Sequence, residues 1–309
     1  MPIAEAHVKG ATTVAEGSPT VRRRELGALL RKLRKDKDLT VDQVTAYLEC
    51  SASKISRIET GQRGATPRDV RDLCDLYGVT DQAERERLVG LAREGKQQGW
   101  WQSYDLPFAT PMYVGLEAEA VRIKDYDSAV IPGLLQSADY LRALHDDPLP
   151  EPTDRELTPE LVERRVEARL IRQQLLTRRH PPPLEFWAIM DEAALHRLIG
   201  GPAVMGAQLK RVVEAMQLPN VTVQVVPYSI GPHPALNSTF NILEFSGAAP
   251  HLVYSEGLAG FIFMEREEDV ERYNDVFRHL SDIALTPDQS ADLMIRLAEA
   301  YANALRATG

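Results

Sequence analysis

Residues 39–61, LTVDQVTAYLECSASKISRIETG, constrain the fold of this chain more than any other stretch. Thr40 is of a type that favours helix N-caps, and the apolar spacing after it predicts a short helix. A turn at residues 49–51 follows, in which Ser51 can cap a second helix. Gly61 tolerates the left-handed backbone that ends a helix. The stretch therefore predicts two short helices joined by a three-residue turn.

The second of these helices is expected to have a buried side and an open side. Ile55 and Ile58 are spaced to point inward. The other positions hold small, polar or cationic side chains: Ala52, Ser53, Lys54, Ser56 and Arg57. A pair of short helices whose second member is polar and basic outside is typical of a helix-turn-helix motif.

Charge separates this motif from an ordinary helical hairpin, which is the simplest alternative. Residues 21–71 hold 13 Lys and Arg against 7 Asp and Glu, a net charge of +6, whereas the whole chain carries −9. The rest of the chain therefore carries −15. In an acidic protein with one basic segment, the anion-binding surface is localised on that segment. We therefore predict that it binds double-stranded DNA.

The run SASKISRIETGQRGATPRDVRDLCDLYGV resembles the Xre-type, phage-repressor-like DNA-binding domain, and the resemblance spans residues 21–79. The I-x-x-I-E-x-G core of that family appears here as Ile55, Ile58, Glu59 and Gly61. Two positions depart from the family, which often has Ala at position 45 and Gly at position 49, where this chain has Thr45 and Glu49. A left-handed Glu costs about 1 kcal/mol, so we expect a slightly adjusted turn within the same fold.

The resemblance implies contacts with DNA for eight side chains. Base-edge contacts in the major groove are implied for Ala52, Ser53, Ser56 and Arg57. Phosphate contacts are implied for Thr40, Ser51, Lys54 and Arg63. Arg57 is the one able to hold a guanine through two hydrogen bonds. Because one such domain reads few base pairs, we expect a homodimer on a palindromic site.

Helical patterns on both sides of the motif complete a five-helix domain, expected at residues 21–97. A leucine stripe predicts the first helix at residues 22–35, with arginines and lysines on its other faces. Two more helices are expected at residues 66–77, capped by Thr66 and ended by Gly78, and at residues 81–96, capped by Thr80. Residues 1–20 are expected to be a flexible leader.

Composition and motifs argue against several classes of protein. No run of 18 apolar residues occurs, so we expect no membrane span, and residues 1–20 lack the apolar core of a signal peptide. Cys50 and Cys74, without metal-ligand spacing, are expected to be reduced thiols in the cytoplasm. The sequence lacks phosphate-binding loops, dinucleotide fingerprints, zinc motifs and nucleophile elbows. We expect no cofactor, no metal and no enzyme activity.

Residues 98–111 are too rich in aromatic residues for a flexible linker. They include Trp100, Trp101, Tyr104 and Phe108. We expect this connector to pack on the domain that follows it. A ligand or partner surface formed by Trp100, Trp101 and Tyr104 is the alternative.

Residues 112–309 predict an α+β domain with a small, mainly antiparallel sheet, within a chain that is mostly α. Helices are expected at residues 112–127, 136–145, 158–179, 191–199, 204–218, 267–282 and 288–305. Strands are expected at residues 184–190, 221–227, 240–245, 252–255 and 261–264. The charged helix at residues 158–179 has a narrow apolar stripe, which suits a dimer contact or a plain surface helix.

His233 and Asn237 are the candidate ligand-binding or partner-binding residues of this domain. They share a polar loop at residues 231–239. A structural role for His233 is the simpler interpretation, and a pocket around the two residues is the alternative.

The phrases AVIPGLLQSADYLRAL, EAALHRLIGG, VTVQVVPYSIGPHPALNSTFNILEF and LVYSEGL resemble the C-terminal domain of WhiJ-type regulators of actinobacteria. This resemblance implies a transcriptional regulator. We expect its C-terminal domain, residues 112–309, to sense a ligand or a small protein. A first alternative is an antitoxin-like protein that sequesters a small protein encoded nearby and binds DNA only to regulate itself. A second is an enzyme fused to a DNA-binding domain, which convergent ionisable groups in a pocket would favour.

Overall fold

The computed structural model describes residues 19–96, 99–104, 106, 110–145, 158–247, 249–257 and 260–308. The chain divides into two compact units, Met1–Ser103 and Tyr104–Gly309. Most of the expected leader, at residues 1–18, and Phe108 of the connector lie outside the described residues. The connector at residues 98–111 falls on both sides of the boundary between the units.

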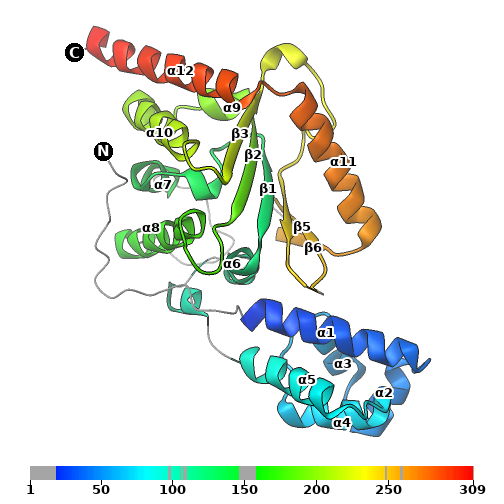
Figure 1. Ribbon diagram of the computed structural model, residues 1–309. Coiled ribbons are helices and arrows are strands. Elements are labelled where there is room, and N and C mark those ends of the chain that lie inside the picture. The colour runs from blue at the N-terminus through cyan, green and yellow to red at the C-terminus, as the bar shows by residue number, and fades with distance from the viewer. Residues whose placement is uncertain are drawn as a thin grey trace. The chain divides into compact units, whose positions relative to one another are not determined.

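The N-terminal unit contains the five expected helices (Figure 1). They are α1 (Pro19–Asp36), α2 (Val41–Leu48), α3 (Ala52–Glu59), α4 (Pro67–Tyr77) and α5 (Gln82–Glu94). Their apolar stripes meet in one core that includes Leu30, Val44, Ile55, Val70 and Leu88, each at most 1% exposed. Burial of these stripes stabilises helices that are too short to persist alone.

The cap residues of this unit lie where the sequence predicts them, with one exception. Thr40 and Gln43 form a reciprocal capping box at the start of α2, and the Thr66 side chain accepts a hydrogen bond from the backbone N–H of Asp69. The cap of α5 is Asp81, whose carboxylate accepts from the Ala83 N–H at 3.1 Å, so the assignment to Thr80 was wrong by one residue. An Asp one position later competes well with Thr for this role.

Glu49 also corrects an expectation. It adopts the left-handed conformation itself, with φ 48° and ψ 47°, and its N–H bonds the Thr45 carbonyl oxygen. The turn is therefore not adjusted to avoid a left-handed Glu. The left-handed conformation of Glu49 costs about 1 kcal/mol. The adjoining helices hold the backbone in this conformation despite that cost.

The C-terminal unit is built on a six-stranded mixed sheet in the order β3-β2-β1-β4-β5-β6. The strands are β1 (Arg122–Asp127), β2 (Glu185–Asp191), β3 (Val221–Val226), β4 (Phe240–Glu244), β5 (Leu252–Gly257) and β6 (Gly260–Met264). The pairings β1–β2 and β2–β3 are parallel, and the other three are antiparallel. Strand β1 joins the two halves, since it is parallel to β2 and antiparallel to β4.

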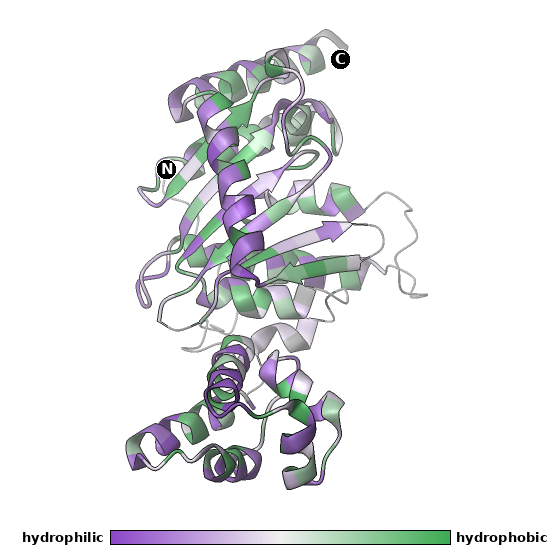
Figure 2. Cartoon of the chain, turned by 90° about the vertical axis from the view of Figure 1, so that its right-hand side faces the viewer, coloured by the Kyte–Doolittle hydropathy of each residue, from purple (hydrophilic) through white to green (hydrophobic). Residues whose placement is uncertain are grey.

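Helices cover both faces of this sheet, so the unit has three layers (Figure 1). The helices are α6 (Thr110–Glu119), α7 (Ala138–His145), α8 (Pro159–Gln173), α9 (Glu192–His196), α10 (Gly201–Ala215), α11 (Glu267–Ile283) and α12 (Pro287–Thr308). Helix α11 lies on one face, where Phe277 and Leu280 join a core with Tyr126 and Phe240. Its outer surface is largely hydrophilic (Figure 2). Helices α6, α7, α8 and α10 lie on the other face (Figure 1).

Two expectations for this unit are wrong. Residues 112–127 are not one helix, because α6 ends at Glu119 and β1 occupies the rest. The helix expected at residues 158–179 ends earlier, as α8 at Gln173, and it is not a plain surface helix. Its Arg165 and Arg172 are buried, at 8% and 6% exposed. Within the described ranges, no helix is both long and apolar enough to cross a membrane.

Candidate nucleic-acid interface and charged cavity

Helix α3 presents the four predicted base-contact residues on its open surface. Ala52, Ser53, Ser56 and Arg57 are all exposed, whereas Ile55 and Ile58 are 1% and 2% exposed. No ion pair involves the Arg57 guanidinium among the described residues. An exposed, unpaired guanidinium on a polar helix face is able to hold a guanine or a phosphate.

Three of the predicted phosphate-contact residues are exposed at a helix N-terminus or just after α3. Thr40 and Ser51 are the N-caps of α2 and α3, where their hydroxyl oxygens accept from the backbone N–H groups of Gln43 and Lys54 at 3.3 and 3.2 Å. Backbone N–H groups at helix N-termini favour anions such as phosphate. Arg63 follows α3 and is exposed, and its own N–H donates to the Arg57 carbonyl oxygen at 2.9 Å.

Lys54 differs from the other predicted phosphate contacts because it already has a partner. Its Nζ donates to Oδ1 of Asp69 at 2.7 Å. Burial alone would raise the pKa of Asp69, but hydrogen bonds from Lys54 and Thr66 outweigh it and hold that pKa below its ordinary value. The pair ties α3 to α4, so a phosphate contact by Lys54 would have to compete with Asp69.

Helix α3 is held against α1 by a part-buried ion pair and a close backbone approach. Arg34 donates from Nε and Nη2 to both carboxylate oxygens of Glu59, at 2.6 and 2.9 Å. The two side chains are 12% and 7% exposed. A Cβ at Gly27 of α1 would lie 2.8 Å from the Glu59 carbonyl oxygen. These contacts fix the orientation in which α3 presents its open face.

The aromatic connector residues are placed as a short 3-10 turn, Trp100–Tyr104. The rings of Trp100 and Trp101 meet edge to face, with centroids 6.0 Å apart, and Trp101 is buried. Tyr104 lies near Glu167 of α8, and burial together with that carboxylate raises its pKa. The expectation that the connector packs on the C-terminal unit therefore has support at Tyr104.

His233 and Asn237 do not form one site. The His233 side chain is buried, with Nε2 3.5 Å from Oδ2 of Asp191 and its ring edge-on to Tyr126. Asn237 is exposed. Neither residue lines the cavity described next.

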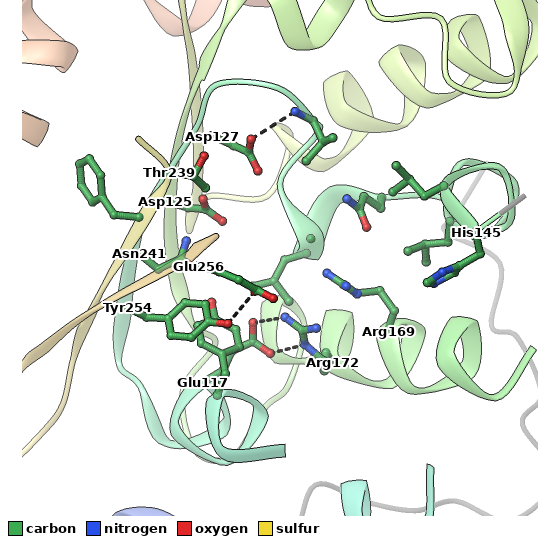
Figure 3. A pocket seen from close by; sticks show the side chains of 18 residues that line it. Glu117, Asp125, Asp127, His145, Arg169, Arg172, Thr239, Asn241, Tyr254 and Glu256 are labelled. Atoms are coloured by element: carbon green, nitrogen blue, oxygen red, sulfur yellow. Dashed lines mark hydrogen bonds and ion pairs between the residues drawn. The ribbon is translucent and has the colours of Figure 1, made fainter. Parts of the chain in front are cut away.

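A cavity of about 300 Å³ opens in the C-terminal unit, between the sheet and helices α6, α7 and α8. Figure 3 shows its lining, which is strongly ionisable. The charged and polar residues come from several elements: Glu117, Asp125, Asp127, Gln136, His145, Arg169, Arg172, Thr239, Asn241 and Glu256. None of these ten is among the site residues predicted from the sequence.

One ion pair in this cavity is buried, and its two charges compensate each other. Arg172 donates from Nε and Nη2 to the two carboxylate oxygens of Glu117, at 2.6 and 2.7 Å, with side chains 7% and 1% exposed. Burial acts to lower the pKa of Arg172, but Glu117 outweighs it and raises that pKa above its usual value. The Arg172 guanidinium also stacks over the Tyr113 ring at 5.5 Å.

Two aspartates of β1 stand on the strand side of the cavity. Burial and the charge of Asp127 raise the pKa of Asp125 well above its ordinary value, against a hydrogen bond from Asn241. Burial also raises the pKa of Asp127, although its Oδ1 accepts from the N–H groups of Ala129 and Val130 at 3.0 and 3.1 Å. Both carboxyls would gain from a cationic partner.

A signal for this cavity does exist in the sequence. Arg165, Arg169 and Arg172 are spaced by four and three residues, which places them on one helix face. Arginines that share a face with the apolar stripe of a helix indicate buried or cavity-facing guanidinium groups. The carboxylates that meet them come from distant parts of the chain and give no local signal.

The N-terminal unit is a DNA-binding domain of the helix-turn-helix class: a family model described as a helix-turn-helix domain matches residues 25–88. A second model, described as a domain of unknown function (DUF5753), matches residues 110–296, which is more than half of the sequence. The chain belongs to that family. Comparisons with curated proteins and with solved structures gave no significant match.

Proposed function

We propose that this protein is a sequence-specific transcriptional regulator of the Xre type that acts in the cytoplasm. The observation that carries the proposal is the open face of α3, on which Ser53, Ser56 and the unpaired Arg57 are exposed together. Helix α3 enters the major groove, where Arg57 holds a guanine. Thr40, Ser51 and Arg63 contact phosphates around it and set the register without reading sequence.

The test is to replace Arg57 by Ala and measure affinity for an operator selected from a random DNA library. We expect a loss of about 1–3 kcal/mol on the operator and little change on random DNA, because a bidentate guanine contact is lost. Arg63→Ala is the matched control, since a phosphate contact should weaken binding on both DNAs and lower the salt slope by about 1. Equal losses of affinity on both DNAs would show that Arg57 makes only an electrostatic contact.

The regulator is proposed to act as a homodimer, because a single domain of this kind offers a small interface and reads few base pairs. Helix α12 is one candidate contact, since its Ile295 and Leu305 are 41% and 40% exposed. Light scattering at micromolar concentration should give about twice the mass of the chain. A monomeric mass both with and without operator DNA would contradict this proposal.

A second proposed role is that of the C-terminal unit as a non-catalytic sensor that alters DNA binding. The charged cavity at β1 and α8 supports a small-molecule effector. Coupling between cavity and operator would be reciprocal, with each ligand changing the affinity of the other by the same factor. The rival, in which this unit sequesters a small protein and DNA binding is autoregulatory, would be favoured by a small partner that co-purifies with the chain.

A further inference from the structure

Arg169 lines the cavity, but its guanidinium makes no contact within the described ranges that would explain its place as a support of the fold. Its guanidinium projects from α8 into the cavity toward the strand side (Figure 3). Among the described residues, no hydrogen bond or ion pair reaches it, in contrast to Arg172 one turn later. Burial lowers the pKa of Arg169 to about 10, so the side chain still carries its charge at neutral pH. Glu117 and Glu256 favour the charge of Arg169 from a distance, but among the described residues neither forms an ion pair with its guanidinium.

The backbone makes room for this arginine. A Cβ at Gly133 would collide with Nη1 of Arg169 and would lie 3.7 Å from Nη2 of Arg172. Gly133 opens the short 3-10 turn Gly133–Leu135, which follows a buried Pro132. The absence of a side chain at this position lets the guanidinium reach the cavity. The site is thus shaped around Arg169 from two separate elements.

Carboxyl groups lie across the cavity, and a cation beside them would favour their ionised form against burial. Asp125 and Asp127 come from β1, and Asn241 and Thr239 come from β4 and the residues before it (Figure 3). Glu256 is already held by the Tyr254 hydroxyl, which donates to it at 2.6 Å. Since Arg172 and Glu117 neutralise each other, Arg169 and the titratable His145 remain on the helix side, and carboxyls remain on the strand side.

This arrangement selects a ligand by its charges. Arg169 requires an anionic group, and a carboxylate is the natural match for a guanidinium. The β1 aspartates require a cationic group that donates hydrogen bonds. A phosphate ester would bring two negative charges beside Asp125, Asp127 and Glu256, and a neutral sugar would leave Arg169 without an ion-pair partner.

We propose that the cavity binds a small zwitterion, an amino acid or dipeptide, whose carboxylate meets Arg169 and whose ammonium group meets Asp125 and Asp127. This rests on the proposed sensor role and supplies the effector class that the role lacks. The cavity volume of about 300 Å³ is at the lower end for small-molecule pockets and suits a ligand of this size.

The first test uses the full-length wild-type chain without DNA. The probes are the 20 proteinogenic L-amino acids and their glycyl dipeptides, screened by thermal shift and followed by calorimetric titration. For each stabilising compound, the analogue without the amino group and the analogue without the carboxylate are titrated as well. We expect at least tenfold weaker binding for both analogues, because each leaves one side of the cavity unpaired. This comparison needs no variant and does not depend on how a variant folds.

The second test assigns the site. Arg169→Gln should weaken binding of the same compound at least tenfold, and Asp125→Asn should do the same. Arg164→Gln is the matched control, since Arg164 lies on the exposed side of α8 and should leave affinity unchanged. A flat thermal response to every probe overturns the proposal. Full affinity in an analogue that lacks either charge, or in Arg169→Gln, also overturns it.

A third measurement separates this inference from the proposed function. Operator affinity of the full-length chain is measured with and without the best-binding probe. Binding of the probe with an altered operator affinity supports both the site and the sensor role. Probe binding without any change in operator affinity supports the site and overturns the coupling alone. Operator binding without probe binding leaves the DNA-binding proposal standing and overturns the zwitterion site.

Discussion

Glu117→Ala should lower the free energy of unfolding of the C-terminal unit by about 3–5 kcal/mol, because removing one partner of a buried ion pair leaves the other charge uncompensated. The charge left behind would be Arg172, whose side chain is 7% exposed. Urea-dependent hydrogen exchange of the β1 and β2 peptides measures this loss separately from the N-terminal unit.

Glu163→Ala is the matched control for this prediction. Glu163 pairs with Arg142 at 2.6 Å, as short a contact as that between Glu117 and Arg172, but the side chains are 57% and 42% exposed. Exposed pairs contribute about 0–1 kcal/mol, so the loss should stay within that range. The double variant Glu117→Met, Arg172→Met should recover much of the stability, since it removes both charges together. Equal, small losses from Glu117→Ala and Glu163→Ala would contradict the buried-charge argument.

Gly27→Ala should destabilise the N-terminal unit by about 1–3 kcal/mol, the usual cost of overpacking a well-filled contact. The new Cβ would collide with the carbonyl oxygen of Ile58 and would lie 2.8 Å from that of Glu59. Both are backbone atoms, so no side chain can move aside. Hydrogen exchange of α1 and α3 peptides gives the change in stability, and operator affinity should fall as α3 is displaced.

Gly90→Ala provides the control for the same substitution. Gly90 lies inside α5, and a Cβ there would meet no atom within 4 Å. Alanine should therefore stabilise the unit by about 0.4–1 kcal/mol, because it restricts the unfolded chain and suits a helix. If Gly27→Ala proved neutral or stabilising like Gly90→Ala, the close approach of α1 and α3 would not limit the fold.

The N-terminal unit could be predicted closely from sequence because its signals are local. Thr40, Ser51 and Thr66 cap helices whose apolar residues recur at helical spacing, and each cap acts within three residues of itself. The part-buried pair between Arg34 and Glu59 joins residues 25 positions apart. No local pattern shows it, although Glu59 belongs to the family core that the resemblance identifies.

The C-terminal unit shows why the remaining predictions failed. Strand β1 reads RIKDYD, a polar sequence whose alternation becomes meaningful only once β2 and β4 pair on either side. Expecting a helix there also hid Asp125 and Asp127 as site residues. The cavity gathers side chains from α6, β1, α8, β4 and β5, so its chemistry exists only after long-range folding.

The attachment of α3 to its unit has a consequence for changing what this protein recognises. Ile55, Ile58 and Glu59 hold the helix from its inner side, and Ser51 fixes its start. None of the side chains that face outward, at positions 52, 53, 56 and 57, takes part in that support. The four outward side chains can therefore be replaced together without changing the contacts that hold α3. If α3 reads DNA as proposed, selection at these four codons should redirect the domain toward a new operator.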